Sequence, residues 1–524
     1  MRCTLRTRSA LALAGAAMLP HCVTSGTETD NPIGPDGIEL RRSALAYQAE
    51  AVAPAADRAA LRAGLRGFSL DLYRAVAADA AGEDNLFLGP YGVATVLAMT
   101  AAGARGATEA ELTAALRHGL APDALPVAMN ELAQDLRAGV AGTEVRFDAW
   151  QSLWLAADRP TGTPFLDVLS QHYDTGIYLV DFANDADLAR SRINEWIDQQ
   201  TAGLIPELFA PGELDPTTAL VLTSAAYLSA PWQDRFEPES TWTGEFALLD
   251  GGVVEVPFMS RTFEYPHVFD VDWRALELPF RDADMGMVFV LPNEGELEAL
   301  EAGFDAALVE RIVAGLEVDR GEQLVRAVVP RFEFSSAREL RPALESLGVT
   351  TLFDPLAAEL TGIDPEGGTY VDDLVQRSTI GVDEYGTTAA AATGEVMIPS
   401  AITPQLWLDR PFLFFIYDHG TGTVLFVGRL ARPDGEARAP AEPPVAPTDA
   451  EIICEGLAEC TGRATTVAEC VSALADDDPA VLEQCADCVK LGVDQCGGMG
   501  TCENFIGDVC DPATCADYCP AHAF

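Results

Sequence analysis

Lysine is almost absent from this chain of 524 residues: Lys490 is the only one, and arginine fills the other basic positions. The 33 basic side chains face 81 acidic ones, which leaves a formal net charge of −48. A protein that holds nucleic acid through phosphate contacts needs clustered lysine and arginine. The composition therefore argues against nucleic acid as a partner, and we interpret the acidic surface as an aid to solubility.

Catalytic motifs are also missing. The sequence has six histidines, and none lies in a recognisable nucleophile motif. There is no Gly-x-Ser-x-Gly elbow, no His-Glu-x-x-His helix and no glycine-rich phosphate loop. We expect His172 and His267 to be structural, and we expect neither a metal nor a cofactor. The sequence thus predicts a protein that is not an enzyme.

Cysteine is absent from the long middle of the chain, and ten of the twelve cysteines lie in the last segment. Such density in a short segment of a secreted chain is typical of a module stapled by disulfides. A zinc site is the weaker reading, because Cys485 and Cys488 have no second pair at the same spacing. The connectivity stays open, as does the role of the tail, which either docks to a partner or caps the chain. The predicted disulfide cysteines are Cys454, Cys460, Cys470, Cys485, Cys488, Cys496, Cys502, Cys510, Cys515 and Cys519.

The N-terminus reads as a secretory signal. Three arginines precede the apolar stretch from Ala10 to Leu19, which is too short to span a membrane. Cys22 follows closely and is a candidate for lipid attachment, although His21 replaces the small residue usually needed there. Simple secretion and lipid anchoring both stay open. The body is expected outside the cytoplasm, either extracellular or on the outer surface, with membrane contact only through Cys22.

Composition divides the chain into five parts. Residues 26–55 lack periodicity and predict a flexible tether, whereas the segment from Pro433 to Ala450 is rich in proline, alanine and acidic residues and predicts a linker. The predicted organisation is a signal peptide at 1–25, a tether at 26–55, a folded domain at 56–433, a linker at 434–450 and a cysteine-rich module at 451–524.

The folded domain shows both helical and strand periodicity, which predicts an α+β fold. Phe68, Leu72 and Tyr73 share one helical face, and Thr108 to Glu111 resembles a helix start. The segment from Leu220 to Leu228 is apolar almost throughout, as in a strand buried on both faces. Further paired strands are expected at Val254–Met259, Ala275–Phe280 and Met285–Pro292.

The stretch from Gly381 to Pro411 is unlike the rest of the domain. On propensity alone its run Ala389–Ala392 would form a helical turn. However, Gly386 and Gly394 bracket the run, and the neighbouring threonines are β-branched residues that suit a strand. Side chains this small allow the segment to slide between two existing strands.

These residues carry a family resemblance. Glu384, Gly386 and Thr387, together with the run that ends at Thr393, resemble the hinge of the serpins, and Arg410–Phe412 and Phe426–Arg429 resemble their carboxy-terminal signature. Motifs in the family's order extend from about Ala56 to Pro433. The resemblance implies three β-sheets, about nine helices and an exposed reactive-centre loop, in a bacterial-type secreted or lipoprotein member with an added cysteine-rich module.

By this resemblance the scissile bond joins Ser400 and Ala401, and the bait residues before it are Val396, Met397, Ile398 and Pro399. The implied hinge comprises Glu384, Gly386, Thr387, Thr388, Ala389, Ala390, Ala391, Ala392 and Thr393. The residues implied where the loop enters and the sheet opens are Trp232, Ser224, Gln376, Gly89, Gly92 and Asn194. Serines usually stand at the two glycine positions and an asparagine at Ser224, which puts the local hydrogen bonding in question.

The resemblance implies an irreversible suicide-type inhibitor of serine, or also cysteine, endopeptidases. Its partner would be the target protease, held as a covalent acyl-enzyme while the cleaved loop inserts into the main sheet, and the inhibitor would act as a monomer. No lysine or arginine lies between Arg377 and Arg410, so the bait favours elastase-like or subtilisin-like enzymes. The alternative is a non-inhibitory extracellular binding protein whose function lies in the tail.

Overall fold

The computed structural model describes residues 38–433, apart from residues 81, 83, 202, 204, 319–323 and 388–402. Within these residues the chain forms three β-sheets and nine α-helices, in agreement with the expected α+β architecture. The helices are α1 (Ala55–Asp79), α2 (Pro90–Gly103), α3 (Gly106–Ala115), α4 (Ala124–Val140), α5 (Thr163–Tyr173), α6 (Phe182–Gln200), α7 (Leu297–Ala302), α8 (Ala306–Val318) and α9 (Arg341–Ser346).

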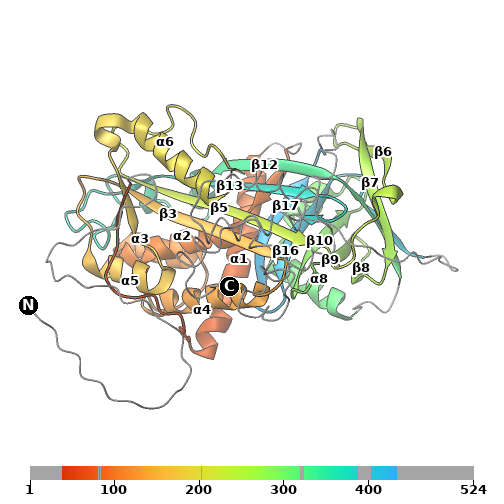
Figure 1. Cartoon of the computed structure of the whole chain (residues 1–524), viewed down its shortest axis with the longest axis horizontal. Coiled ribbons are helices and arrows are strands. Elements are labelled where there is room, and N and C mark those ends of the chain that lie inside the picture. The colour runs from red at the N-terminus through yellow and green to blue at the C-terminus, as the bar shows by residue number, and fades with distance from the viewer. Residues whose placement is uncertain are drawn as a thin grey trace, which may run out of the picture.

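The main sheet runs through the centre of the molecule (Figure 1). Its long central strand β5 is apolar and buried on both faces, as the sequence predicts. The strand order is β1 (Glu39–Arg41), β4 (Ile177–Val180), β3 (Arg146–Ala156), β5 (Leu220–Pro231), β13 (Val371–Val382) and β12 (Phe332–Glu339), and the short strand β14 (Gly386–Thr387) also pairs with β5.

Two further sheets complete the fold. The second has the order β2 (Leu86–Leu88), β17 (Thr423–Leu430), β16 (Phe412–Asp418), β10 (Met285–Pro292), β9 (Trp273–Pro279) and β8 (His267–Phe269). The third has the order β15 (Gln405–Trp407), β11 (Val325–Pro330), β7 (Val253–Phe263) and β6 (Trp242–Ala247). The strands expected around residues 254–259, 275–280 and 285–292 are confirmed as β7, β9 and β10.

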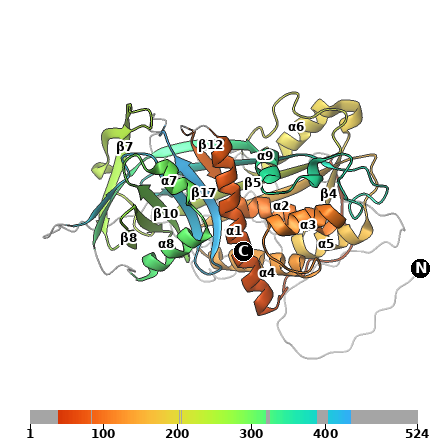
Figure 2. The ribbon, with the colours of Figure 1, turned by 180° about the vertical axis from the view of Figure 1, so that it is seen from behind.

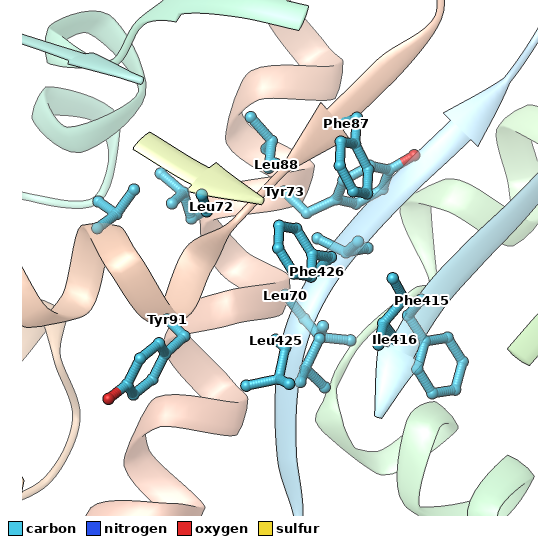
Figure 3. Packing of buried hydrophobic residues seen from close by; sticks show 14 of the residues in the cluster. Leu70, Leu72, Tyr73, Phe87, Leu88, Tyr91, Phe415, Ile416, Leu425 and Phe426 are labelled. Atoms are coloured by element: carbon cyan, nitrogen blue, oxygen red, sulfur yellow. The ribbon is translucent and has the colours of Figure 1, made fainter. Parts of the chain in front are cut away.

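The main sheet separates two hydrophobic clusters. On one face α1 and α2 pack over it, and Figure 2 shows these helices from behind the view of Figure 1. There Phe87 of β2 stacks on Phe426 of β17 with ring centroids 5.0 Å apart, among the side chains drawn in Figure 3. On the other face α6 covers β3 and β5 through Ile193, Trp196 and Ile197. Both faces of the central strand are therefore shielded from water from Leu220 to Ala226.

Side chains of β5 alternate between these two clusters. Leu220, Leu222, Ala226 and Leu228 belong to the cluster on the α2 side, whereas Val221 and Ala225 belong to the cluster under α6. This follows from the two-residue repeat of a strand, in which successive side chains point to opposite faces. The alternation fixes which face any residue paired with β5 would take.

Two local expectations differ from the structure. The tether predicted for residues 26–55 overlaps the folded body, because Glu39–Arg41 pairs with β4 in the main sheet. Helix α3 begins at Gly106 rather than at Thr108, whose hydroxyl instead accepts a hydrogen bond from the Glu359 amide at 3.0 Å. Sequence periodicity detects neither feature, since both depend on partners distant in the chain.

Within the described residues, none of the helices combines the length and the hydropathy needed to cross a membrane. In the same part of the chain, no three histidine, cysteine or acidic side chains are arranged to hold a metal ion.

Candidate functional site: where the main sheet parts

Strands β5 and β13 are parallel neighbours that separate before either of them ends. Their pairing extends from Val371 opposite Leu220 to Ser378 opposite Ala226. Beyond this point β13 continues to Val382 and β5 continues to Pro231. At one end of the main sheet, the two central strands are thus no longer paired with each other.

The first residues of the expected hinge already lie at this division. Gly386 and Thr387 form β14 and pair antiparallel with Pro231 and Ala230 of β5. Thr387 is only 2% exposed. A Cβ atom added at Gly386 would lie 2.2 Å from the carbonyl oxygen of Ala230, so only glycine fits there.

Trp232 fixes the turn from which this hinge emerges. Its amide donates to the carbonyl of Tyr385 at 2.9 Å, and its indole Nε1 donates to the carbonyl of Asp383 at 2.9 Å. The Asp383 carboxylate accepts hydrogen bonds from the amides of Tyr385 and Gly386, while its burial raises its pKa. In the described structure Trp232 thus lies beside the first residues of the expected hinge.

The hinge glutamate is anchored by an ion pair that the sequence analysis missed. Glu384 is fully buried, and its Oε2 accepts from Nε and Nη2 of Arg331 at 2.6 and 2.5 Å. Its other oxygen accepts a hydrogen bond from the hydroxyl of Thr241. Arg331 lies between β11 and β12, directly after Pro330. An arginine placed between two strands was the feature of the sequence that could have indicated an ion pair with a buried carboxylate.

A polar cluster lies under the sheet where the strands are still joined. The Gln376 side chain spans the backbone of Gly89: its Nε2 donates to the Gly89 carbonyl at 2.8 Å, and its Oε1 accepts from the Gly89 amide at 3.1 Å. The same Nε2 lies 3.3 Å from the Ser224 hydroxyl. Gln376 therefore links β13 to the chain between β2 and α2 and to β5.

Side chains of the sheet lie close to the two glycine positions at which the family usually has serines. A Cβ at Gly92 would lie 2.5 Å from the Ser224 hydroxyl and 3.0 Å from Nε2 of Gln151. A Cβ at Gly89 would lie 3.3 Å from Nε2 of Gln376. Side chains from the strands thus occupy the space that a serine would need, which answers the question raised by the missing serines.

Asn194 lies apart from these groups. It sits on α6, where its Oδ1 accepts from the amides of Leu208 and Phe209 at 3.0 and 2.9 Å. Its role in the described structure is to hold the segment after α6 against that helix. Of the residues assigned to sheet opening, the structure therefore groups Gly89, Gly92, Ser224 and Gln376, places Trp232 at the hinge and leaves Asn194 outside.

The remaining site residues fall outside the described part of the chain. They comprise the rest of the hinge, which is Thr388, Ala389, Ala390, Ala391, Ala392 and Thr393, the bait residues Val396, Met397, Ile398 and Pro399, and the bond between Ser400 and Ala401. The ten tail cysteines and Cys22 also lie outside it.

Asp373 lies on β13 at the opposite end of the joined strands. The register slips between Val371 and Asp373, and Oδ1 of Asp373 is buried without a hydrogen-bond partner among the described residues. Burial raises the pKa of this carboxyl to about 7, with a further contribution from Glu339 and Glu213, while Arg341 opposes the shift. The folded protein therefore favours the protonated form of Asp373.

We expect this group to make the protein less stable as pH rises. The folded pKa of Asp373, about 7, exceeds the unfolded value of about 3.9. The contribution of Asp373 to the free energy of unfolding is therefore fully present below pH 4 and is lost as the pH rises from 4 to 7. This difference in pKa corresponds to a free energy on the order of 4 kcal/mol. Asp373→Asn should thus raise the urea midpoint at pH 8 and leave it nearly unchanged at pH 4. An equal effect at both pH values would contradict this assignment.

Taken together, the three-sheet fold and the two central strands that part at one end point to one class of protein. Residues 63–433 match the family model of the serpins, described as serine protease inhibitors. The chain therefore belongs to the serpin family. Members of this family are inhibitors of proteases rather than enzymes, which agrees with the expectation from the sequence.

Relatives support the same family over most of the folded domain. A serpin-like protein of Thermococcus kodakarensis is 33% identical over 374 residues, which cover 70% of this chain and 85% of that protein. The leukocyte elastase inhibitor of Sus scrofa is 32% identical over 376 residues, covering 70% of this chain and 97% of the inhibitor.

Solved structures show the same fold. Tengpin, a thermophilic serpin in its native state, superposes with a TM-score of 0.67 at 22% identity, covering 75% of this chain and 99% of tengpin. Uncleaved ovalbumin gives a TM-score of 0.64 at 24% identity, covering 71% of this chain and all of the ovalbumin chain. At these identities the likeness bears on the fold alone.

Proposed function

We propose that the chain is a suicide-type inhibitor that traps a serine endopeptidase by inserting its cleaved loop between β5 and β13. The observation that carries the proposal is the pairing of Gly386 and Thr387 with the end of β5, at the point where β5 leaves β13. A strand antiparallel to β5 is also antiparallel to β13, since those two are parallel. The hinge therefore has the direction that insertion requires.

The covalent step follows from ordinary serine protease chemistry. The protease serine attacks the carbonyl carbon of Ser400, an acyl-enzyme ester forms, and the amino group of Ala401 leaves with the proton transferred from the serine. The loop then stays attached to the protease through Ser400, while the break after Ser400 lets the residues that follow the hinge enter the sheet. Insertion must outrun hydrolysis of the ester for the protease to be trapped.

The register of β14 extends to the residues that follow it. If pairing continues, Ala389 comes opposite Leu228, Ala391 opposite Ala226 and Thr393 opposite Ser224. These β5 side chains lie on the α2 side of the sheet, so the odd-numbered hinge residues would face that core. Four of these five inward positions are small or β-branched: Thr387, Ala389, Ala391 and Thr393, with Glu395 as the fifth.

Thr393 suits the polar cluster under the sheet. Ser224 and Gln376 stand opposite each other in the present register of β5 and β13. An inserted strand would separate them, and the Thr393 hydroxyl would then lie where it can bond to either. Glu395 is the least favourable inward residue, because a buried carboxylate costs several kcal/mol unless it is paired.

Insertion is favourable overall because it satisfies backbone groups along the parted strands. Roughly a dozen hydrogen bonds at about 0.5 to 1.5 kcal/mol each amount to on the order of 10 kcal/mol. That is comparable to the stability of a whole domain. It is enough to displace a bound protease and distort its active site.

The proposed targets are elastase-like or subtilisin-like enzymes. The bait from Val396 to Ala401 is uncharged, and no basic residue lies nearby to fill an acidic specificity pocket. One relative bears the name leukocyte elastase inhibitor. We further propose that the inhibitor acts as a monomer outside the cytoplasm, secreted or anchored through Cys22, with a disulfide-bonded module at residues 451–524.

The test is incubation with elastase-like and subtilisin-like proteases, followed by denaturing electrophoresis and mass spectrometry. The proposal predicts a complex that survives denaturation and a released fragment that begins at Ala401. Cleavage at this bond by every protease in the panel, with no covalent complex, would contradict inhibition. That outcome would favour the alternative of a non-inhibitory binding protein that acts through its tail.

A further inference from the structure

A second site lies away from the hinge, between α4, α5 and β3. It is a cavity of about 290 Å³, close to the lower end of the volumes that small-molecule sites occupy. Aromatic rings line it from several elements: Tyr91 and Phe147 have centroids 6.0 Å apart, and Tyr178 and Trp196 have centroids 5.3 Å apart. Met99 and Met129 add adaptable apolar surface.

Three polar atoms in this lining have no hydrogen-bond partner among the described residues. They are Nε2 of Gln151, the hydroxyl of Tyr173 and Nδ1 of His172, and each is shielded from solvent. A buried polar atom without a partner costs about 1 to 3 kcal/mol. A cavity with apolar walls and unpaired polar atoms is the arrangement expected of a ligand site.

The charge of the lining is opposite to that of the protein. The chain carries 81 acidic side chains, yet none of those in the described part of the chain lines this cavity. Among the described residues of the lining, the one arginine is Arg137, an exposed side chain of α4 whose Nη1 donates to the hydroxyl of Tyr47 at 3.2 Å. Burial lowers the pKa of His172, which keeps that ring neutral near pH 7. The lining therefore offers donors and positive charge to an acceptor group.

We propose that this cavity binds a small aromatic carboxylate, with its ring among the aromatic side chains and its carboxylate directed toward Gln151, Tyr173 and Arg137. A planar ring matches the walls, and an acceptor-rich head group matches amide, phenol and guanidinium donors. A cationic head group would face donors and a like charge. The proposal concerns binding alone and does not depend on loop insertion.

The test uses isothermal titration calorimetry of the full chain with three probes that share one ring system: 1-naphthaleneacetate, 1-naphthaleneacetamide and 1-naphthylmethylamine. We expect one site for the carboxylate, with an affinity at least about tenfold higher than that for the amide. The amine should bind more weakly than either. Equal binding of the amine and the carboxylate, or no heat from the carboxylate at millimolar concentration, overturns the proposal.

Variants locate the site. Ala133→Trp places a large side chain in the lining from α4 and should weaken carboxylate binding by at least about tenfold. Arg137→Gln and Tyr173→Phe should each weaken it about fivefold. Arg274→Gln, an exposed change on β9 in the second sheet, is the matched control and should have no effect.

Thermal melting verifies that each variant is folded. If Ala133→Trp does not fold, Tyr173→Phe tests whether the carboxylate binds in this cavity, because this variant removes one hydroxyl and keeps the ring. Carboxylate binding that is unchanged in Tyr173→Phe and Arg137→Gln shows that the probe lies elsewhere and overturns the assignment.

Discussion

Replacing Ala391 with arginine is expected to convert the inhibitor into a substrate. In the register that β14 begins, Ala391 comes opposite Ala226, which is 3% exposed and faces the core on the α2 side. An arginine there would have to be buried without a partner during insertion, at a cost on the order of 3 to 5 kcal/mol. A barrier raised by that amount slows insertion by roughly a hundredfold or more. Hydrolysis of the acyl-enzyme then comes first.

The measurement is the number of inhibitor molecules cleaved for each protease molecule trapped, which should rise at least about tenfold for Ala391→Arg. The matched control is Ala390→Arg, one residue earlier. It comes opposite Tyr227, which is partly exposed on the other face of the sheet, and should remain an inhibitor. If Ala391→Arg inhibits as well as the unchanged protein, the register is wrong.

Removing the arginine that pairs with the hinge glutamate is expected to destabilise the uncleaved protein. Among the described residues, Arg331→Met leaves the fully buried Glu384 with the Thr241 hydroxyl as its one side-chain partner. Breaking a buried ion pair from one side costs about 3 to 5 kcal/mol, because the remaining charge stays buried. We expect the free energy of unfolding to fall by about 3 kcal/mol. The measurement is a urea titration in which unfolding is monitored by tryptophan fluorescence.

Two control proteins distinguish the effect of breaking the Arg331–Glu384 ion pair from the effect of removing any arginine. Arg326→Met removes an exposed arginine on the neighbouring strand β11 and should change stability by less than about 1 kcal/mol. Glu384→Gln combined with Arg331→Met should recover much of the loss, since no charge is then left unpaired. An Arg331→Met protein as stable as Arg326→Met would show that the pair does not hold the hinge.

Much of the fold follows from local patterns in the sequence. The apolar run of β5 and the shared helical face of Phe68, Leu72 and Tyr73 each predict an element that the structure confirms. The small residues around Gly386 indicate a segment that fits between strands, and its first two residues pair with β5. These features depend on residues close in the chain, which is why the sequence reveals them.

The missed features depend on pairs of residues that are distant in the chain. Arg331 and Glu384 meet only because β12 and β13 return to the same end of the sheet. Gln376 fills the space beside Gly89, almost three hundred residues away. The question about hydrogen bonding at Gly89 and Gly92 came from considering each position alone, whereas strand side chains lie close to both glycines in the structure.

The most direct test of insertion is the melting temperature before and after cleavage of the loop within residues 396–402 by a protease that is not trapped. If the cleaved strand enters between β5 and β13, about 10 kcal/mol of added stability should raise the melting temperature by about 10 °C or more. Cleaved Ala391→Arg should show little of this rise. A cleaved protein that melts at or below the temperature of the intact one would contradict insertion.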